Sequence, residues 1–133
     1  MTPAVSGAPS LQAVDVLLQR LGYWGEAGSG LPAPSALIDD SWNDMDRDLV
    51  AEHLGRGFVA RAYTGHATCR VCGDQVGSLE LTDGTYIWPE GLRHYVAAHS
   101  IRLPERFVEH VRTFTDEIEG ADVDDSWWRS LAD

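Results

Sequence analysis

The sequence predicts an α+β fold built around a small β-hairpin and the helix that follows it, with further helices on either side. Residues 78–88 alternate apolar and polar side chains about an Asp-Gly dipeptide, which is typical of a hairpin. Residues 89–99 show helical spacing. Two cysteines precede the hairpin and two histidines lie on the helix. These candidate metal ligands are Cys69, Cys72, His94 and His99. The arrangement predicts a zinc-stapled, zinc-finger-like ββα core at about residues 65–100.

Composition limits the classes of function. The chain has 133 residues, enough for one domain, and its 21 acidic and 10 basic residues give a net charge of -11. Such a surface repels phosphate backbones, so we expect no nucleic-acid partner. The N-terminus lacks the basic and apolar regions of a signal peptide, and no stretch approaches the roughly 20 apolar residues that span a bilayer. We therefore expect a cytoplasmic protein with no membrane contact and with reduced thiols.

The N-terminal third is predicted to contain one helix and one loop. Residues 1–9 are small and rich in Pro and Gly, so they are predicted to be disordered, and residues 10–133 to form a single domain. From Ser10, apolar residues recur at helical spacing until Gly22. They are Leu11, Val14, Leu18 and Leu21. Glycines and prolines predict a loop over residues 25–36.

The middle of the chain predicts a helix, a strand and the hairpin. Residues 44–57 are expected to be helical, with Asp44 as the N-cap. The side chains expected to face inward are Leu49, Val50, His53 and Leu54. Residues 58–65 are expected to form a strand. In the hairpin, Leu79 and Leu81 share one face, and Ser78, Glu80 and Thr82 lie on the other. Asp83-Gly84 predicts a two-residue turn whose central residues both have positive φ.

The C-terminal part predicts two helices and an acidic segment. Pro89 and Glu90 suit the beginning of the histidine-bearing helix. The longest helix is expected to start at Pro104. Its apolar stripe consists of Phe107, Val111, Phe114 and Ile118. The last stretch is acidic and carries Trp127 and Trp128.

Three chemistries compete for Cys69 and Cys72. A thioredoxin-like redox pair requires a helix directly after the second cysteine, whereas Gly73 and a strand pattern follow here. A disulfide would close only a very small loop and suits a secreted protein better. A metal site needs two more ligands, which the histidines of the next helix supply.

The ligand spacing favours zinc. A C-x2-C turn directs both sulfurs to one point, and Gly73 relieves backbone crowding after the second. Histidines separated by three to five residues can reach one tetrahedral ion if the helix ends near the second. The hairpin is longer than in a typical finger. His66 and His110 are near enough in sequence that either can replace a predicted ligand. We expect His53 to be a structural side chain. Thiolate and imidazole ligands favour zinc over iron.

Residues 65–111 resemble a group of small bacterial zinc-binding proteins. The shared features are the CxxCG knuckle, the TDG turn, a W-P-E-G-L-x-H-Y-V segment and a downstream L-P-x-x-F. The resemblance implies that the two cysteines and two histidines belong to one motif, and that the protein is bacterial. It implies no activity.

The function predicted from these features is that of a protein-interaction or regulatory module with a structural zinc. Four protein ligands leave no open position for substrate. The alternative is a small zinc-dependent enzyme of the hydrolase type, with an open zinc position and Glu90 or His66 as the base, but no familiar catalytic motif supports it. We expect a protein partner with a basic surface, because Trp127 and Trp128 lie among carboxylates. The other interpretation is that these tryptophans cover the core. The sequence leaves the oligomeric state open.

Overall fold

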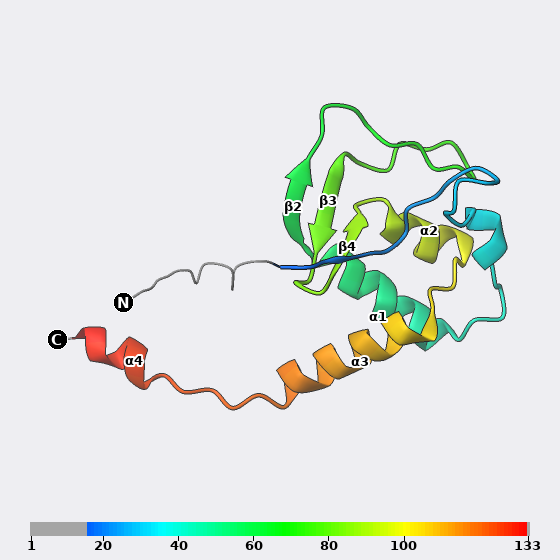
Figure 1. The fold of residues 1–133 in the computed structure, drawn as a ribbon. Helices are drawn as coiled ribbons and strands as arrows, with labels where there is room; N and C mark the ends of the chain where they lie inside the picture. Colours follow the sequence, from blue (N-terminus) through cyan, green and yellow to red (C-terminus); the bar gives the residue numbers. More distant parts are fainter. Residues whose placement is uncertain (1–15, 133) are drawn as a thin grey trace, which may run out of the picture. The chain divides into compact units, whose positions relative to one another are not determined.

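The computed structural model describes residues 16–132, so the N-terminal segment predicted to be disordered lies outside it. The chain divides into two compact units on either side of the Arg102–Leu103 bond. The first unit contains a four-stranded mixed sheet and two α-helices (Figure 1). The predicted α+β class is confirmed. Among residues 16–132, no helix has the length and apolar character that crossing a bilayer requires.

The sheet has the strand order β1-β4-β3-β2. The predicted hairpin forms its centre, since β3 (Leu79–Thr82) pairs antiparallel with β4 (Tyr86–Pro89). The predicted strand β2 (Phe58–Ala62) pairs antiparallel with β3 and is irregular between Val59 and Arg61. At the other edge, β1 (Gln19–Arg20) runs parallel to β4.

The helix predicted for residues 10–22 is wrong over its described part. Gln19 and Arg20 form β1, and Gln19 N–H donates to Thr85 O over 2.9 Å. Leu21 N–H likewise donates to Ile87 O over 2.9 Å. These backbone groups form hydrogen bonds with β4 and not within a helix. This long-range pairing outweighs the local helix propensity of the segment. Residues 10–15 of the predicted helix lie outside the described part.

The hairpin turn also differs from the prediction. Gly84 has a φ of +96°, but Asp83 is not among the residues with positive φ. Instead, the Asp83 carboxylate accepts the N–H groups of Thr85 (2.9 Å) and Tyr86 (2.8 Å). Asp83 therefore orders the turn through its side chain, as Asx turns do.

Two helices cover the core of the first unit. Helix α1 (Asp44–Gly55) packs against α2 (Leu92–His99), and Figure 1 shows them side by side. The N-cap of α1 is Asn43, whose side chain accepts Asp46 N–H, so the prediction that Asp44 is the cap was wrong by one residue. The indole N–H of Trp88 donates to Leu54 O over 3.1 Å and joins the sheet to α1. The fully buried side chains of this unit include Val50, Leu54, Leu92 and Val96. The predicted loop contains one short 3-10 helix, η2 (Pro34–Leu37).

Glu80 lies on the polar face of β3, opposite Leu79 and Leu81, yet it is buried. The hydroxyl groups of Tyr23 and Tyr63 both donate to its carboxylate, and Arg61 lies 3.5 Å from Oε1. Burial of a carboxylate is costly unless it is hydrogen-bonded and paired. The two phenols and the guanidinium meet that requirement.

The second unit contains α3 (Glu105–Glu119), α4 (Ser126–Arg129) and η3 (Ser130–Ala132). Phe107 and Val111 of the predicted stripe are buried, but Ile118 is 65% exposed. Trp127 and Trp128 are 72% and 67% exposed, so they do not form a core within this unit.

Candidate metal centre

Cys69 and Cys72 lie on a tight turn between β2 and β3. Gly73 N–H donates to Cys69 O, and Cys69 N–H donates to Asp74 O, each over 2.8 Å. Val71 N–H approaches the sulfur of Cys69 at 3.4 Å. Gly73 has a φ of +83°, a conformation that is strained for residues with a Cβ. The predicted role of this glycine, to let the chain turn directly after the second thiol, agrees with this geometry.

Helix α2 supplies the two histidines. His94 lies in its first turn and His99 is its last residue. Ser100 then adopts a left-handed conformation with a φ of 52°, and its N–H donates to Tyr95 O. The helix therefore ends at the second histidine. This is the condition under which two histidines at this spacing reach one ion.

The structure brings the four predicted residues together. Their ligand atoms all lie within 4.8 Å of one another, and the group can hold a metal ion. Cys72 Sγ lies 3.3 Å from His94 Nε2, and His99 Nε2 lies 3.2 Å from the same nitrogen. Bond lengths of about 2.3 Å to sulfur and about 2.0–2.1 Å to nitrogen place tetrahedral ligands roughly 3.6 Å (S to N) and 3.3 Å (N to N) apart. The observed separations are close to these values.

The two thiols have different surroundings. Cys69 is 2% exposed, whereas Cys72 is exposed. Burial alone would raise the pKa of Cys69, but the N–H groups of Cys72 and Val71 and the Cys72 thiol outweigh it and lower this pKa. The backbone N–H of Asp74 favours the Cys72 thiolate, but desolvation and the neighbouring Cys69 thiol raise the pKa of Cys72 overall. Without a metal, Cys69 is therefore the more acidic thiol. A cysteine is a good metal ligand only in its thiolate form.

Tyr95 connects the knuckle to α2. Its hydroxyl accepts the N–H of Arg70 over 2.8 Å, and burial raises its pKa. The Trp24 ring packs edge-on against it, with 5.4 Å between the ring centroids. Sequence reasoning missed this contribution, because an aromatic residue beside a histidine on a helix carries no signal of such a contact.

The alternative ligands have other positions. His66 is not part of the four-residue group and lines a separate cavity together with Glu90. Glu90, considered above as a catalytic base, accepts the N–H groups of Ser78 and Leu79 at 3.0 and 3.2 Å. His53 lies 2.8 Å from Asp83 in a buried pair, consistent with the expected structural role. His110 belongs to α3, in the second unit.

Comparisons with known proteins give no relative. No family model, no curated protein and no solved structure matches the chain. A function is therefore inferred from the chemistry of the site itself.

Proposed function

We propose that this protein binds one zinc ion for structural purposes and acts as an interaction or regulatory module for a protein partner. The observation that carries the proposal is the group of two thiols and two imidazoles within 4.8 Å of one another. This donor set favours zinc, and with all four groups bound a tetrahedral ion has no open position. The ion would hold the knuckle to helix α2, as the predicted zinc-stapled ββα core requires.

The proposed partner has a basic and partly apolar surface. The supporting feature is the acidic Trp segment, residues 116–131, in which exposed Trp127, Trp128 and Leu131 follow a run of carboxylates. The acidic residues are Asp116, Glu117, Glu119, Asp122, Asp124 and Asp125. Aromatic side chains dominate binding energy at many interfaces, and charge complementarity raises the rate of association.

Cobalt substitution tests whether the zinc is structural. A closed tetrahedral site gives intense visible absorption that does not change when azide is added. A spectrum that shifts with azide reveals an exchangeable position and favours the hydrolase alternative.

A capture experiment tests the partner. The immobilised protein is compared with a Trp127→Ala/Trp128→Ala variant and with the control Phe58→Ala, which removes another aromatic that is 76% exposed. We expect the immobilised wild type and the immobilised control to retain the same partner protein at low salt. The double variant should not retain it. Capture that is unaffected by the double substitution, or no capture at all, contradicts the interaction proposal.

A further inference from the structure

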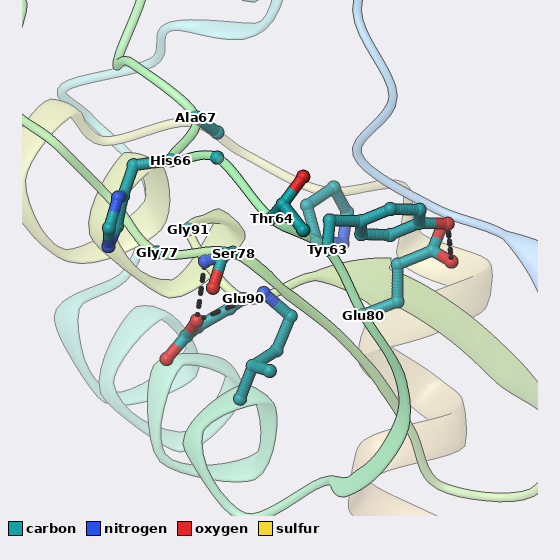
Figure 2. A pocket seen from close by; sticks show the side chains of 12 residues that line it. Tyr63, Thr64, His66, Ala67, Gly77, Ser78, Glu80, Glu90 and Gly91 are labelled. Carbon is teal, nitrogen blue, oxygen red and sulfur yellow. Dashed lines mark hydrogen bonds between the residues drawn. The ribbon is translucent and has the colours of Figure 1, made fainter.

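A cavity of about 420 Å³ lies at the end of the sheet, beside the segment that follows β2. Two backbone hydrogen bonds hold this segment to the residues before β3. Tyr63 N–H donates to Ser78 O over 2.9 Å, and Ala67 N–H donates to Gly77 O over 2.8 Å. Three residues separate the two donors, whereas the two acceptors are adjacent in the chain. Residues 64–66 must therefore bulge outward, and they form one wall of the cavity (Figure 2).

Glu90 lines the cavity, and one oxygen of its carboxylate accepts two backbone hydrogen bonds. Its Oε1 accepts the N–H groups of both Ser78 and Leu79. Figure 2 shows these two bonds meeting at one oxygen while the other oxygen points away from both donors. A Cβ on Gly77 would lie 2.1 Å from Glu90 Oε1, so only glycine leaves room for the carboxylate. The backbone thus holds the Glu90 carboxylate in a fixed position.

Glu90 forms no ion pair within the described part of the chain, although it also lines a second cavity together with Arg93. The ion pairs found among residues 16–132 do not include Glu90, and the lining of the first cavity contains no arginine. Glu80, which also lines the cavity, differs because two tyrosine hydroxyls and Arg61 surround its carboxylate. A partly buried carboxylate is stabilised by a cation within reach. Glu90 therefore offers a place for a positive group from outside the chain.

The remaining walls suit an apolar stem. They include the Tyr63 ring, Ala67, Leu79 and Pro89. A cavity of this size falls in the range of ligand pockets, which are mostly apolar with a few polar groups that orient the ligand. The net charge of -11 attracts cations to the molecule as a whole.

We propose that this cavity binds the guanidinium or ammonium group of an arginine or lysine side chain, with Glu90 as the recognition residue. The inference rests on the proposed function, because the basic side chain would belong to the partner protein. It locates one contact of that interface on the first unit, separately from the acidic Trp segment.

Titration of the full-length ¹⁵N-labelled protein by NMR tests the proposal. The probe is the peptide acetyl-Ala-Arg-Ala-amide, and the matched probe carries citrulline, an uncharged isostere, in place of arginine. We expect saturable shifts of the backbone amides of Ser78, Leu79 and Gly91 with the arginine peptide, and binding at least about tenfold weaker with citrulline. One charge-assisted hydrogen bond corresponds to a difference of roughly ten- to a hundredfold.

Glu90→Gln removes the charge and keeps an oxygen that can accept the two backbone N–H groups. We expect this variant to bind the arginine peptide about ten- to a hundredfold more weakly. Glu52→Gln, which removes an exposed carboxylate on α1, is the control and should bind as the wild type does. Equal binding of both peptides, equal binding by Glu90→Gln, or no shift at millimolar peptide overturns the proposal. Tighter binding of agmatine, a free guanidinium on a methylene chain, also overturns it, because the cavity would then select a small organic cation.

Zinc content measured on the same samples separates this proposal from the proposed function. One zinc per chain without a response to the peptide overturns the cavity proposal alone. Metal-free protein that still distinguishes the two peptides overturns the structural-zinc proposal alone.

Discussion

The sulfur of Cys72 lies 3.3 Å from Nε2 of His94, although the two residues are 22 positions apart in the chain. The hairpin of β3 and β4 fills that interval, and the turn between its strands returns the chain toward the knuckle. Helix α2 begins shortly after β4 ends. The interval is longer than in a typical zinc finger, yet the hairpin accounts for the extra residues and leaves the ligand geometry intact.

Substitution of Cys69 tests the ligand set. Cys69→Ser replaces a buried thiolate with a poor ligand, so we expect it to weaken zinc binding by more than the roughly 10–100-fold typical of changes around a metal site. The measurement is competition with a chromophoric chelator. His66→Ala and His53→Ala should leave one zinc per chain, because neither residue belongs to the four-residue group. Loss of zinc from His66→Ala would instead assign His66 as a ligand.

Substitution of Gly73 tests the knuckle geometry. Gly73→Ala forces a Cβ into a left-handed conformation, at a cost of about 1–2 kcal/mol. Because this residue directly follows Cys72, we expect the cost to appear as roughly five- to thirtyfold weaker zinc binding. Gly28→Ala is the matched control. Gly28 has a φ of +86° and open space around it, and it lies outside the four-residue group. If both variants bind zinc equally well, the left-handed turn has no part in holding the metal.

Glu80 predicts part of the acid sensitivity of the protein. Burial alone would raise its pKa, but the hydroxyls of Tyr23 and Tyr63 and the charge of Arg61 outweigh it and lower the pKa of Glu80. A lowered folded-state pKa contributes stability that is fully present above the ordinary value of about 4.3 and is lost as the pH falls from there through the lowered pKa. Glu80→Gln should therefore lower stability near neutral pH by about 1–3 kcal/mol and flatten its decline below pH 5. Urea unfolding at several pH values measures both effects. An unchanged acid slope would exclude Glu80 as its source.

Tyr23 predicts how the stability of the protein falls at alkaline pH. Burial, and next the hydrogen bond to Glu80, raise the pKa of Tyr23 well above its ordinary value of about 10. A raised folded-state pKa contributes stability below the ordinary value, and this stability is lost as the pH rises. Tyr23→Phe removes the titrating group, so the decline in melting temperature above pH 10 should become shallower. A variant that loses stability with alkali as steeply as the wild type contradicts this assignment.

Local sequence signals were sufficient for the hairpin, for α1 and α2 and for the four candidate ligands. Alternation, turn residues and helical spacing all act over a few residues, and the ligands lie on elements that these signals define. The cysteine spacing also required no knowledge of distant contacts.

Features that depend on distant contacts were missed. The two residues of β1 form a strand only because β4 offers a free edge. Glu80 is buried beside a tyrosine 57 positions away, whereas alternation along β3 alone places it only on the polar face of the strand. The cavity beside Glu90 arises from a three-residue bulge, whose position depends on the pairing of Tyr63 and Ala67 with their partners. None of these features has a local signature.

The most direct test of the metal proposal is the zinc content of the purified protein, measured by mass spectrometry before and after chelation, with a thermal melt of each sample. The proposal predicts about one zinc per chain, and it predicts that removal of the ion abolishes or sharply lowers the cooperative transition, because zinc in small domains can contribute about 10–16 kcal/mol. Metal-free protein that melts cooperatively, at a temperature unchanged by the chelator, would contradict it.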